Sequence, residues 1–181
     1  MNTILRGIRP LDYVLAGLMT AAGAFLMYAN IAMDGEELPH ALSSTSWAML
    51  PAFLLVTLPI LWRRRNILAV VGVTTAATVL HVLAFGWVTR CGVVLPLSFA
   101  LAYAVARFAG GWKNQVTGLA GIAILQLVML VRDASIDTVG GALPLAIPLA
   151  ALFYGAGVIV QNRISKKQPA VATPAVEHAA V

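Results

Sequence analysis

The apolar runs of this sequence contain few residues that could do chemistry. His81 lies in one such run, and Thr74 and Thr78 precede it so that the three are spaced i, i+4 and i+7. Because a helix places residues at this spacing on one face, we expect these side chains to form a polar stripe that points into a bundle. An ionisable residue in an apolar helix is a candidate for proton or ligand sensing. The alternative is a neutral histidine that hydrogen-bonds to a neighbouring helix.

Two further polar residues lie in apolar runs. Gln126 lies in the middle of a later run, where it is a candidate member of the polar core or the donor of a simple interhelical hydrogen bond. Asp12 lies near the start of the first run, close to Arg6 and Arg9. We expect Asp12 to pair with these two arginines or to reach the lipid headgroups.

The densest charge of the chain is formed by Arg63, Arg64 and Arg65. Basic residues beside a membrane attract anionic lipid or an acidic partner protein, so this cluster is a candidate for lipid or partner contact. The alternative is that the three arginines only mark a tight cytoplasmic turn between two spans.

A second charged group is acidic and lies in the breaks that we place outside the membrane. Carboxylates and histidine there could bind a divalent cation or sense pH, although their spacing matches no defined metal loop. Acidic outer breaks also fit simple topology. The residues of this group are His40, Asp34, Glu36, Glu37, Asp133 and Asp137.

The signatures of the common enzyme classes are absent from the sequence. It contains no phosphate-binding Gly-x-x-x-x-Gly-Lys-[Ser/Thr], no Gly-x-Ser-x-Gly and no His-Glu-x-x-His. No pair of carboxylates lies inside the apolar runs for acid–base work. Cys91 is the only cysteine, which excludes an internal disulfide and a cysteine zinc cage. We therefore expect no enzymatic activity, no cofactor and no metal.

The elements that must position these residues follow from composition. Of 181 residues, 60% are hydrophobic and 10% are charged, and the mean hydropathy is +0.88. This excludes a soluble globule and a large extramembrane domain. Runs without period-2 alternation predict helices rather than a barrel. We expect an all-α, integral membrane six-helix bundle over residues 1–165, with spans at about 11–33, 45–62, 67–88, 93–108, 115–131 and 139–161, and a disordered tail at 166–181.

The positions of the basic residues predict the orientation of this bundle. With the N-terminus in the cytoplasm, ten of the twelve Lys and Arg residues fall on the inner side, and only Arg90 and Arg132 fall outside. Both termini are then cytoplasmic. The net charge of +5 is split between short breaks rather than gathered on one face, which argues against nucleic acid as a partner. The lipid bilayer is the expected partner.

Three short segments, taken in order, carry a resemblance. Residues 9–12 read Arg-Pro-Leu-Asp and open the first span, and residues 58–65 read Leu-Pro-Ile-Leu-Trp-Arg-Arg-Arg and close the second. Residues 101–107, Leu-Ala-Tyr-Ala-Val-Ala-Arg, end the fourth. With these segments the chain resembles, over residues 5–165, the N-terminal membrane-sensor module of a class of bacterial sensor histidine kinases. The resemblance implies a multi-pass protein of the bacterial cytoplasmic (inner) membrane, working as a homodimer or with a membrane or cytoplasmic signalling partner.

The resemblance stops before the catalytic half of those kinases. Their last span continues into a helix with a phospho-accepting histidine and then into an ATP-binding domain, whereas His178 here lies in an Ala- and Val-rich tail. We therefore expect a non-enzymatic sensory module of a two-component type that acts through a partner. The alternative is a small transporter or an accessory subunit of a membrane transport complex, for which the polar stripe and the prolines in the apolar runs would account.

Overall fold

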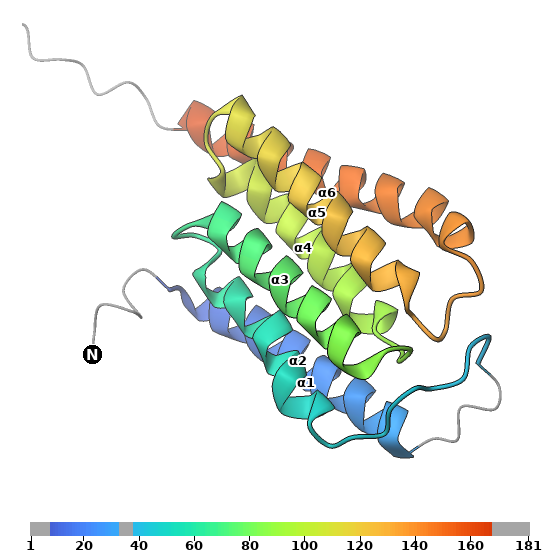
Figure 1. The fold of residues 1–181 in the computed structure, drawn as a ribbon. Coiled ribbons are helices and arrows are strands. Elements are labelled where there is room, and N and C mark those ends of the chain that lie inside the picture. Colours follow the sequence, from blue (N-terminus) through green and yellow to red (C-terminus); the bar gives the residue numbers. More distant parts are fainter. Residues whose placement is uncertain (1–7, 33–37, 168–181) are drawn as a thin grey trace, which may run out of the picture.

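The computed structural model describes residues 8–32 and 38–167, and its regular elements in these ranges are all helical (Figure 1). The expected all-α bundle is thereby confirmed. The elements in chain order are α1 (Pro10–Ala32), α2 (Met49–Thr57), the 3₁₀ helix η2 (Leu58–Trp62), α3 (Ile67–Phe85), α4 (Cys91–Phe108), α5 (Trp112–Val131) and α6 (Val139–Lys167).

Five of these helices, α1, α3, α4, α5 and α6, are long and apolar enough to cross a membrane. This is the layout of a multi-pass membrane protein. The remaining apolar segment, α2 with η2, is shorter than the expected span 45–62, because α2 begins only at Met49. Before that point the Ser44 and Ser46 hydroxyls accept hydrogen bonds from the Ser46 and Ala48 main chain, and such local bonds compete with a helix. Pro59, which has no N–H, then interrupts the α-helical bonding, and η2 follows.

The ends of α3 have clear local causes. Asn66 caps its first turn, since the side chain accepts a hydrogen bond from the Ala69 N–H at 3.1 Å. Gly86 ends the helix with φ +63°, a conformation that favours glycine. At the other end of the chain, α6 continues to Lys167, beyond the expected limit of 161. The predicted disordered tail 166–181 is therefore wrong at residues 166 and 167, which complete the last turn of α6, and residues 168–181 lie outside the described residues.

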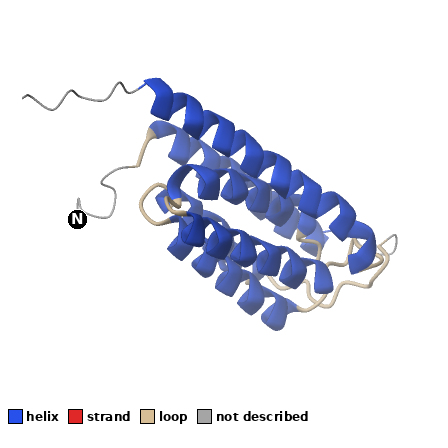
Figure 2. Cartoon of the chain, turned by 90° about the horizontal axis from the view of Figure 1, so that it is seen from above, coloured by secondary structure: helices blue, strands red, loops and turns tan. Residues whose placement is uncertain are grey.

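Helix α4 lies at the centre of the bundle. It packs against α5 and α6, while α3 packs against α2 and α5, and α1 packs against α2 and η2. Seen from above, the helices run side by side along one direction (Figure 2). Small residues allow the close approach that membrane helices need: a Cβ added to Gly157 of α6 would lie 2.7 Å from the Tyr103 carbonyl oxygen of α4.

The bundle has two chemically different ends. The beginning of α1, the α2–α3 turn and the end of α6 lie at one end, which we call the basic end because it includes Arg63, Arg64, Arg65, Arg163 and Lys166 (Figure 1). The far end is formed by the α3–α4 turn, the α5–α6 loop and the segment that precedes α2. There the main chains are tied together by one isolated bridge, between Val88 and Asp133.

Candidate functional site

The polar stripe of α3 faces the interior, as its spacing indicates. Thr74, Thr78 and His81 are all buried, and His81 is only 2% exposed. Thr78 Oγ1 donates to the Thr74 carbonyl oxygen at 2.8 Å, whereas Thr74 Oγ1 is buried without a partner. Among the described residues neither hydroxyl hydrogen-bonds to His81, so the three residues share a face without forming one network.

His81 is instead hydrogen-bonded by Arg90, which lies in the turn between α3 and α4. Arg90 Nε donates to His81 Nδ1 at 3.0 Å. The imidazole ring is also enclosed by aromatic side chains, with Phe53 of α2 edge-on at 5.3 Å and Phe85 at 4.7 Å between ring centroids. These contacts fix the orientation of the ring.

Arg90 itself is completely buried and uses its whole guanidinium. Besides Nε, its Nη1 donates to the carbonyl oxygens of Val88 (3.2 Å) and Arg132 (2.9 Å). Its Nη2 donates to the carbonyl oxygens of His81 (3.3 Å) and Gly86 (2.9 Å). The five donors of the fork therefore all have acceptors, which is the condition for burying a cation in an apolar setting.

Asp133 supplies the opposite charge from the α5–α6 loop. Its carboxylate is fully buried and accepts hydrogen bonds from the main-chain N–H groups of Arg90 and Cys91, both at 2.6 Å. Ser135 also donates to it, through its hydroxyl at 2.6 Å. A carboxylate at the first N–H groups of α4 satisfies donors that the helix cannot pair and interacts favourably with the helix dipole. We call His81, Arg90 and Asp133 the far-end cluster.

The charge state of the cluster follows from these contacts. Burial lowers the pKa of Arg90 to about 10, with the Asp133 carboxylate acting in the opposite direction, so Arg90 is still a cation at neutral pH. An arginine can only donate, so His81 Nδ1 must be the acceptor, and the proton of the neutral ring is on Nε2. A doubly protonated ring would direct an N–H at the Arg90 Nε–H. The imidazole is therefore neutral in this arrangement.

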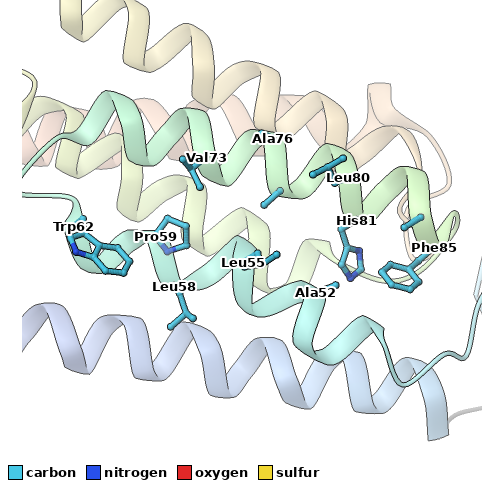
Figure 3. A pocket seen from close by; sticks show the side chains of 12 residues that line it. Ala52, Leu55, Leu58, Pro59, Trp62, Val73, Ala76, Leu80, His81 and Phe85 are labelled. Carbon is cyan, nitrogen blue, oxygen red and sulfur yellow. The ribbon is translucent and has the colours of Figure 1, made fainter. Parts of the chain in front are cut away.

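The imidazole ring of His81 lies at the wall of a pocket between α2 and α3 (Figure 3). The pocket has a volume of about 600 Å³ and is lined by apolar side chains of α2, η2 and α3, such as Ala52, Leu55, Ala76 and Leu80. His81 Nε2 is almost completely enclosed and makes no hydrogen bond of normal geometry among the described residues, but the Met49 main chain lies near the ring as a weak hydrogen-bond acceptor. The far-end cluster thus has, at the wall of an apolar pocket, one buried donor that lacks a full hydrogen bond among the described residues.

Gln126, the other candidate for a polar core, lies elsewhere. Its Nε2 donates to Ser98 Oγ of α4 at 3.0 Å and to the Ala146 carbonyl oxygen of α6 at 3.5 Å. It therefore links α5 with two neighbouring helices, as the interhelical alternative describes, and it is not part of the far-end cluster.

The arginine cluster at the basic end is engaged with Asp12, whose ion pairs among the described residues are with this cluster and not with the Arg9 side chain. Asp12 is fully buried and forms ion pairs with Arg63 and Arg64, each with an N–O distance of 2.8 Å. Arg9 contacts Asp12 through its main chain: its N–H donates to Asp12 Oδ2 at 3.0 Å, and its carbonyl oxygen accepts from the Asp12 N–H at 2.8 Å. Arg6 lies outside the described residues. Asp12 pairs with Arg63 and Arg64 because the α2–α3 turn lies against the first turn of α1. Arg65 also has an interaction partner.

The acidic group does not form a metal site within the described residues, since no three His, Cys, Asp or Glu side chains gather there. His40 stacks on Trp87 with 4.1 Å between ring centroids, and Asp137 is exposed. Asp133 belongs to the far-end cluster. Asp34, Glu36 and Glu37 lie outside the described ranges.

The sequence analysis did not name Arg90 as a candidate site residue, and it placed Asp133 only in the acidic outer group. Both lie in short breaks between spans, where charged residues are expected to face water. A sequence signal does exist, since Arg90 is one of only two basic residues assigned to the outer side. A basic residue on the outer side goes against the positive-inside preference, which indicates that Arg90 has a role other than setting the topology.

Comparison with known proteins finds no matching family model, no matching curated sequence and no matching solved structure. The chemistry of the far-end cluster is therefore the basis for a functional proposal.

Proposed function

We propose that this chain is a non-enzymatic sensory module of the bacterial cytoplasmic membrane that acts through a partner protein. The observation that supports it best is the far-end cluster, in which one arginine joins the pocket-lining residue His81 to the loop that contains Asp133. The bacterial membrane and the signalling role come from the resemblance described above. The pocket and the cluster add a place where a stimulus could act.

A path from the pocket to the basic end runs through two helices. Arg90 and Cys91 begin α4, and Asp133 holds their N–H groups, so a change at His81 acts on the start of α4. α4 packs along α6, with close contact at Gly157. α6 extends to Lys167 at the basic end. Closely packed helices move as units, so this pair is suited to transmit a small shift.

The geometry favours a ligand over a proton as the stimulus. Protonation of His81 Nδ1 would oppose the Arg90 Nε–H, whereas the Nε2–H lacks a full hydrogen bond among the described residues and lies at the wall of the pocket. The basic end is the natural place for the output. Arg163 and Lys166 are exposed there, in contrast to Arg63 and Arg64, which are held by Asp12.

The test combines cross-linking with a change in the pocket. A diazirine amino acid at Lys166 should give a discrete adduct with one membrane or cytoplasmic protein in living cells, and the same label at Asp137 should not. Ala52→Phe, which fills the pocket beside His81, should change the yield of that adduct several-fold. The control Ala21→Phe, on the exposed face of α1, should leave the yield unchanged.

Two results would overturn this proposal. One is an adduct yield that does not respond to Ala52→Phe in a normally expressed protein. The other is solute flux, in proteoliposomes that contain only this chain, that Ala52→Phe abolishes, because this would favour the transporter alternative. ATP-dependent autophosphorylation of the purified chain would contradict the non-enzymatic role.

A further inference from the structure

A hydrogen-bond donor without a full acceptor among the described residues lies at the wall of the pocket between α2 and α3. His81 is 2% exposed, and its Nε2 has no partner among the described residues. Buried polar groups in proteins are paired as a rule, so an N–H without a full hydrogen bond at the wall of a cavity marks a place for an acceptor. The nitrogen is enclosed in this structure, so a ligand oxygen reaches it when the side chains at the pocket wall move apart. We infer that the pocket binds an uncharged, lipid-soluble molecule that offers a carbonyl oxygen to His81 Nε2. The inference rests on the sensory function proposed above and names the class of its ligand.

The ligand must supply an acceptor because the protein fixes His81 as a donor. Arg90 Nε occupies His81 Nδ1 at 3.0 Å, and arginine has no lone pair to offer. The proton of the neutral ring is therefore held on Nε2. The two aromatic side chains around the ring keep this N–H directed at one place in the pocket.

The ligand is uncharged because the pocket offers no counter-charge. The only histidine or charged residue in the lining is His81, and the other lining residues are aliphatic, aromatic or proline. Arg90 lies directly behind His81, but its five donors already have acceptors within the protein. An anion placed here would lose its hydration without gaining a free cation.

The ligand is lipid-soluble because the pocket faces the membrane. Leu55, Leu58, Val73 and Leu80 line it and are also exposed on the outside of the bundle, where lipid surrounds the helices. The volume of about 600 Å³ is in the range of small-molecule sites. His81 and Trp62 lie at opposite ends (Figure 3), so the polar head would lie at α3 and the apolar body along η2.

A photoreactive ketone tests this directly. The full chain in nanodiscs of phosphatidylethanolamine and phosphatidylglycerol is irradiated with a 4-alkylbenzophenone, and the adducts are mapped by mass spectrometry. We expect them near His81, on residues such as Ala52, Leu80 and Ala84. Adducts spread over the exposed residues of α1, such as Leu18 and Phe25, would overturn the site.

Competition with a matched pair isolates the carbonyl group. Unlabelled benzophenone and diphenylmethane share a skeleton and differ by C=O against CH₂, and their amounts are matched by concentration in the bilayer. Irradiation is stopped at low conversion, so that covalent reaction of the unlabelled ketone does not itself deplete the site. We expect benzophenone to protect the site about tenfold better, the typical effect of one buried hydrogen bond. Equal protection would mean that the pocket is only a groove for acyl chains. Stronger protection by the anion 4-benzoylbenzoate would overturn the uncharged class.

Two substitutions separate the two nitrogens of His81. His81→Asn keeps an acceptor near the Nδ1 position for Arg90 and removes the pocket donor, so the preference for the ketone should disappear. His81→Gln places an amide donor near the Nε2 position and should retain part of it. A preference that is unchanged in a folded His81→Asn protein would contradict the inference. If that variant does not fold, the competition in the wild-type chain still decides.

The ligand and the signalling role fail separately. Suppose that labelling is selective for the ketone but the yield of the Lys166 adduct does not change in Ala52→Phe. This result would support the binding site and contradict the sensory function. In the opposite case, the yield of the Lys166 adduct changes in Ala52→Phe but labelling is not selective for the ketone. This result would support the sensory function and contradict the proposed ligand class.

Discussion

Among single residues, Arg90 places the strictest demand on side-chain type. Its planar fork reaches one imidazole nitrogen and four carbonyl oxygens, which come from α3, the α3–α4 turn and the segment after α5. A lysine has three donors on a single atom and no fork. Two of the five acceptors would then remain buried and unpaired.

We therefore expect Arg90→Lys to lower the free energy of unfolding by about 2–4 kcal/mol. The measurement is unfolding with a denaturing detergent, followed by circular dichroism in mild detergent micelles. The control is Arg132→Lys, because the Arg132 side chain is exposed and only its carbonyl oxygen belongs to the cluster. The control should stay within about 0.5 kcal/mol of the wild type. Equal losses for both variants would contradict the role assigned to the fork.

A second prediction for a single residue concerns Asp12. Asp12→Asn removes the negative charge between Arg63 and Arg64 and turns an amide N–H toward one of them. Both arginine side chains are partly exposed, at 12% and 22%, so water compensates for part of the loss. We expect a destabilisation of about 1–3 kcal/mol in the same unfolding assay. Asp137→Asn, at an exposed carboxylate, should have little effect, and a comparable loss there would argue against the ion pairs.

At the scale of helices, the contact between α4 and α6 depends on one missing side chain. A Cβ at Gly157 would lie 2.7 Å from both Ala106 Cβ and the Tyr103 carbonyl oxygen, and the backbone oxygen cannot rotate away. Gly155, on the same helix, has nothing within 4 Å of its added Cβ. The two glycines therefore form a matched pair.

Gly157→Ala should push α6 away from α4 and lower the free energy of unfolding by about 1–3 kcal/mol. Gly155→Ala should leave stability unchanged or raise it slightly, because alanine favours a helix. Thermal unfolding in micelles compares the two. The same loss in both variants would show that helix flexibility, rather than the contact with Tyr103, sets the effect.

At the scale of the whole molecule, the orientation in the membrane is open to direct labelling. The positions of the basic residues predict that both termini are cytoplasmic, so Asp137→Cys should react with an impermeant maleimide in intact cells. Lys166→Cys should react only after the membrane is permeabilised. Both belong in a Cys91→Ser background, which removes the native thiol. Labelling of the Lys166 position from outside would mean that the orientation is the opposite of the predicted one, and it would contradict the positive-inside argument.

Much of the fold could be predicted from the sequence because lipid leaves few alternatives. Apolar runs must be helical, and their ends are visible as tryptophans and basic residues, such as Trp62 and Trp112 at the ends of η2 and α5. The face of His81 also follows from helical spacing. The contacts of Arg90 and Asp133 could not be predicted, because they join breaks far apart in the chain and depend on tertiary packing. The partners of Asp12 were missed for the same reason.

The shortness of the second apolar segment has a consequence for the surrounding bilayer. α2 and η2 together rise about 24 Å, at 1.5 Å per α-helical and 2.0 Å per 3₁₀ residue. The hydrocarbon core of a bilayer is about 30 Å thick, so lipids beside this edge of the bundle must compress, and their hydrophobic mismatch is relieved in membranes with shorter acyl chains. The same edge carries Leu55 and Leu58 at the mouth of the pocket. Acyl-chain length is therefore a second variable, besides any ligand, that acts on this part of the protein.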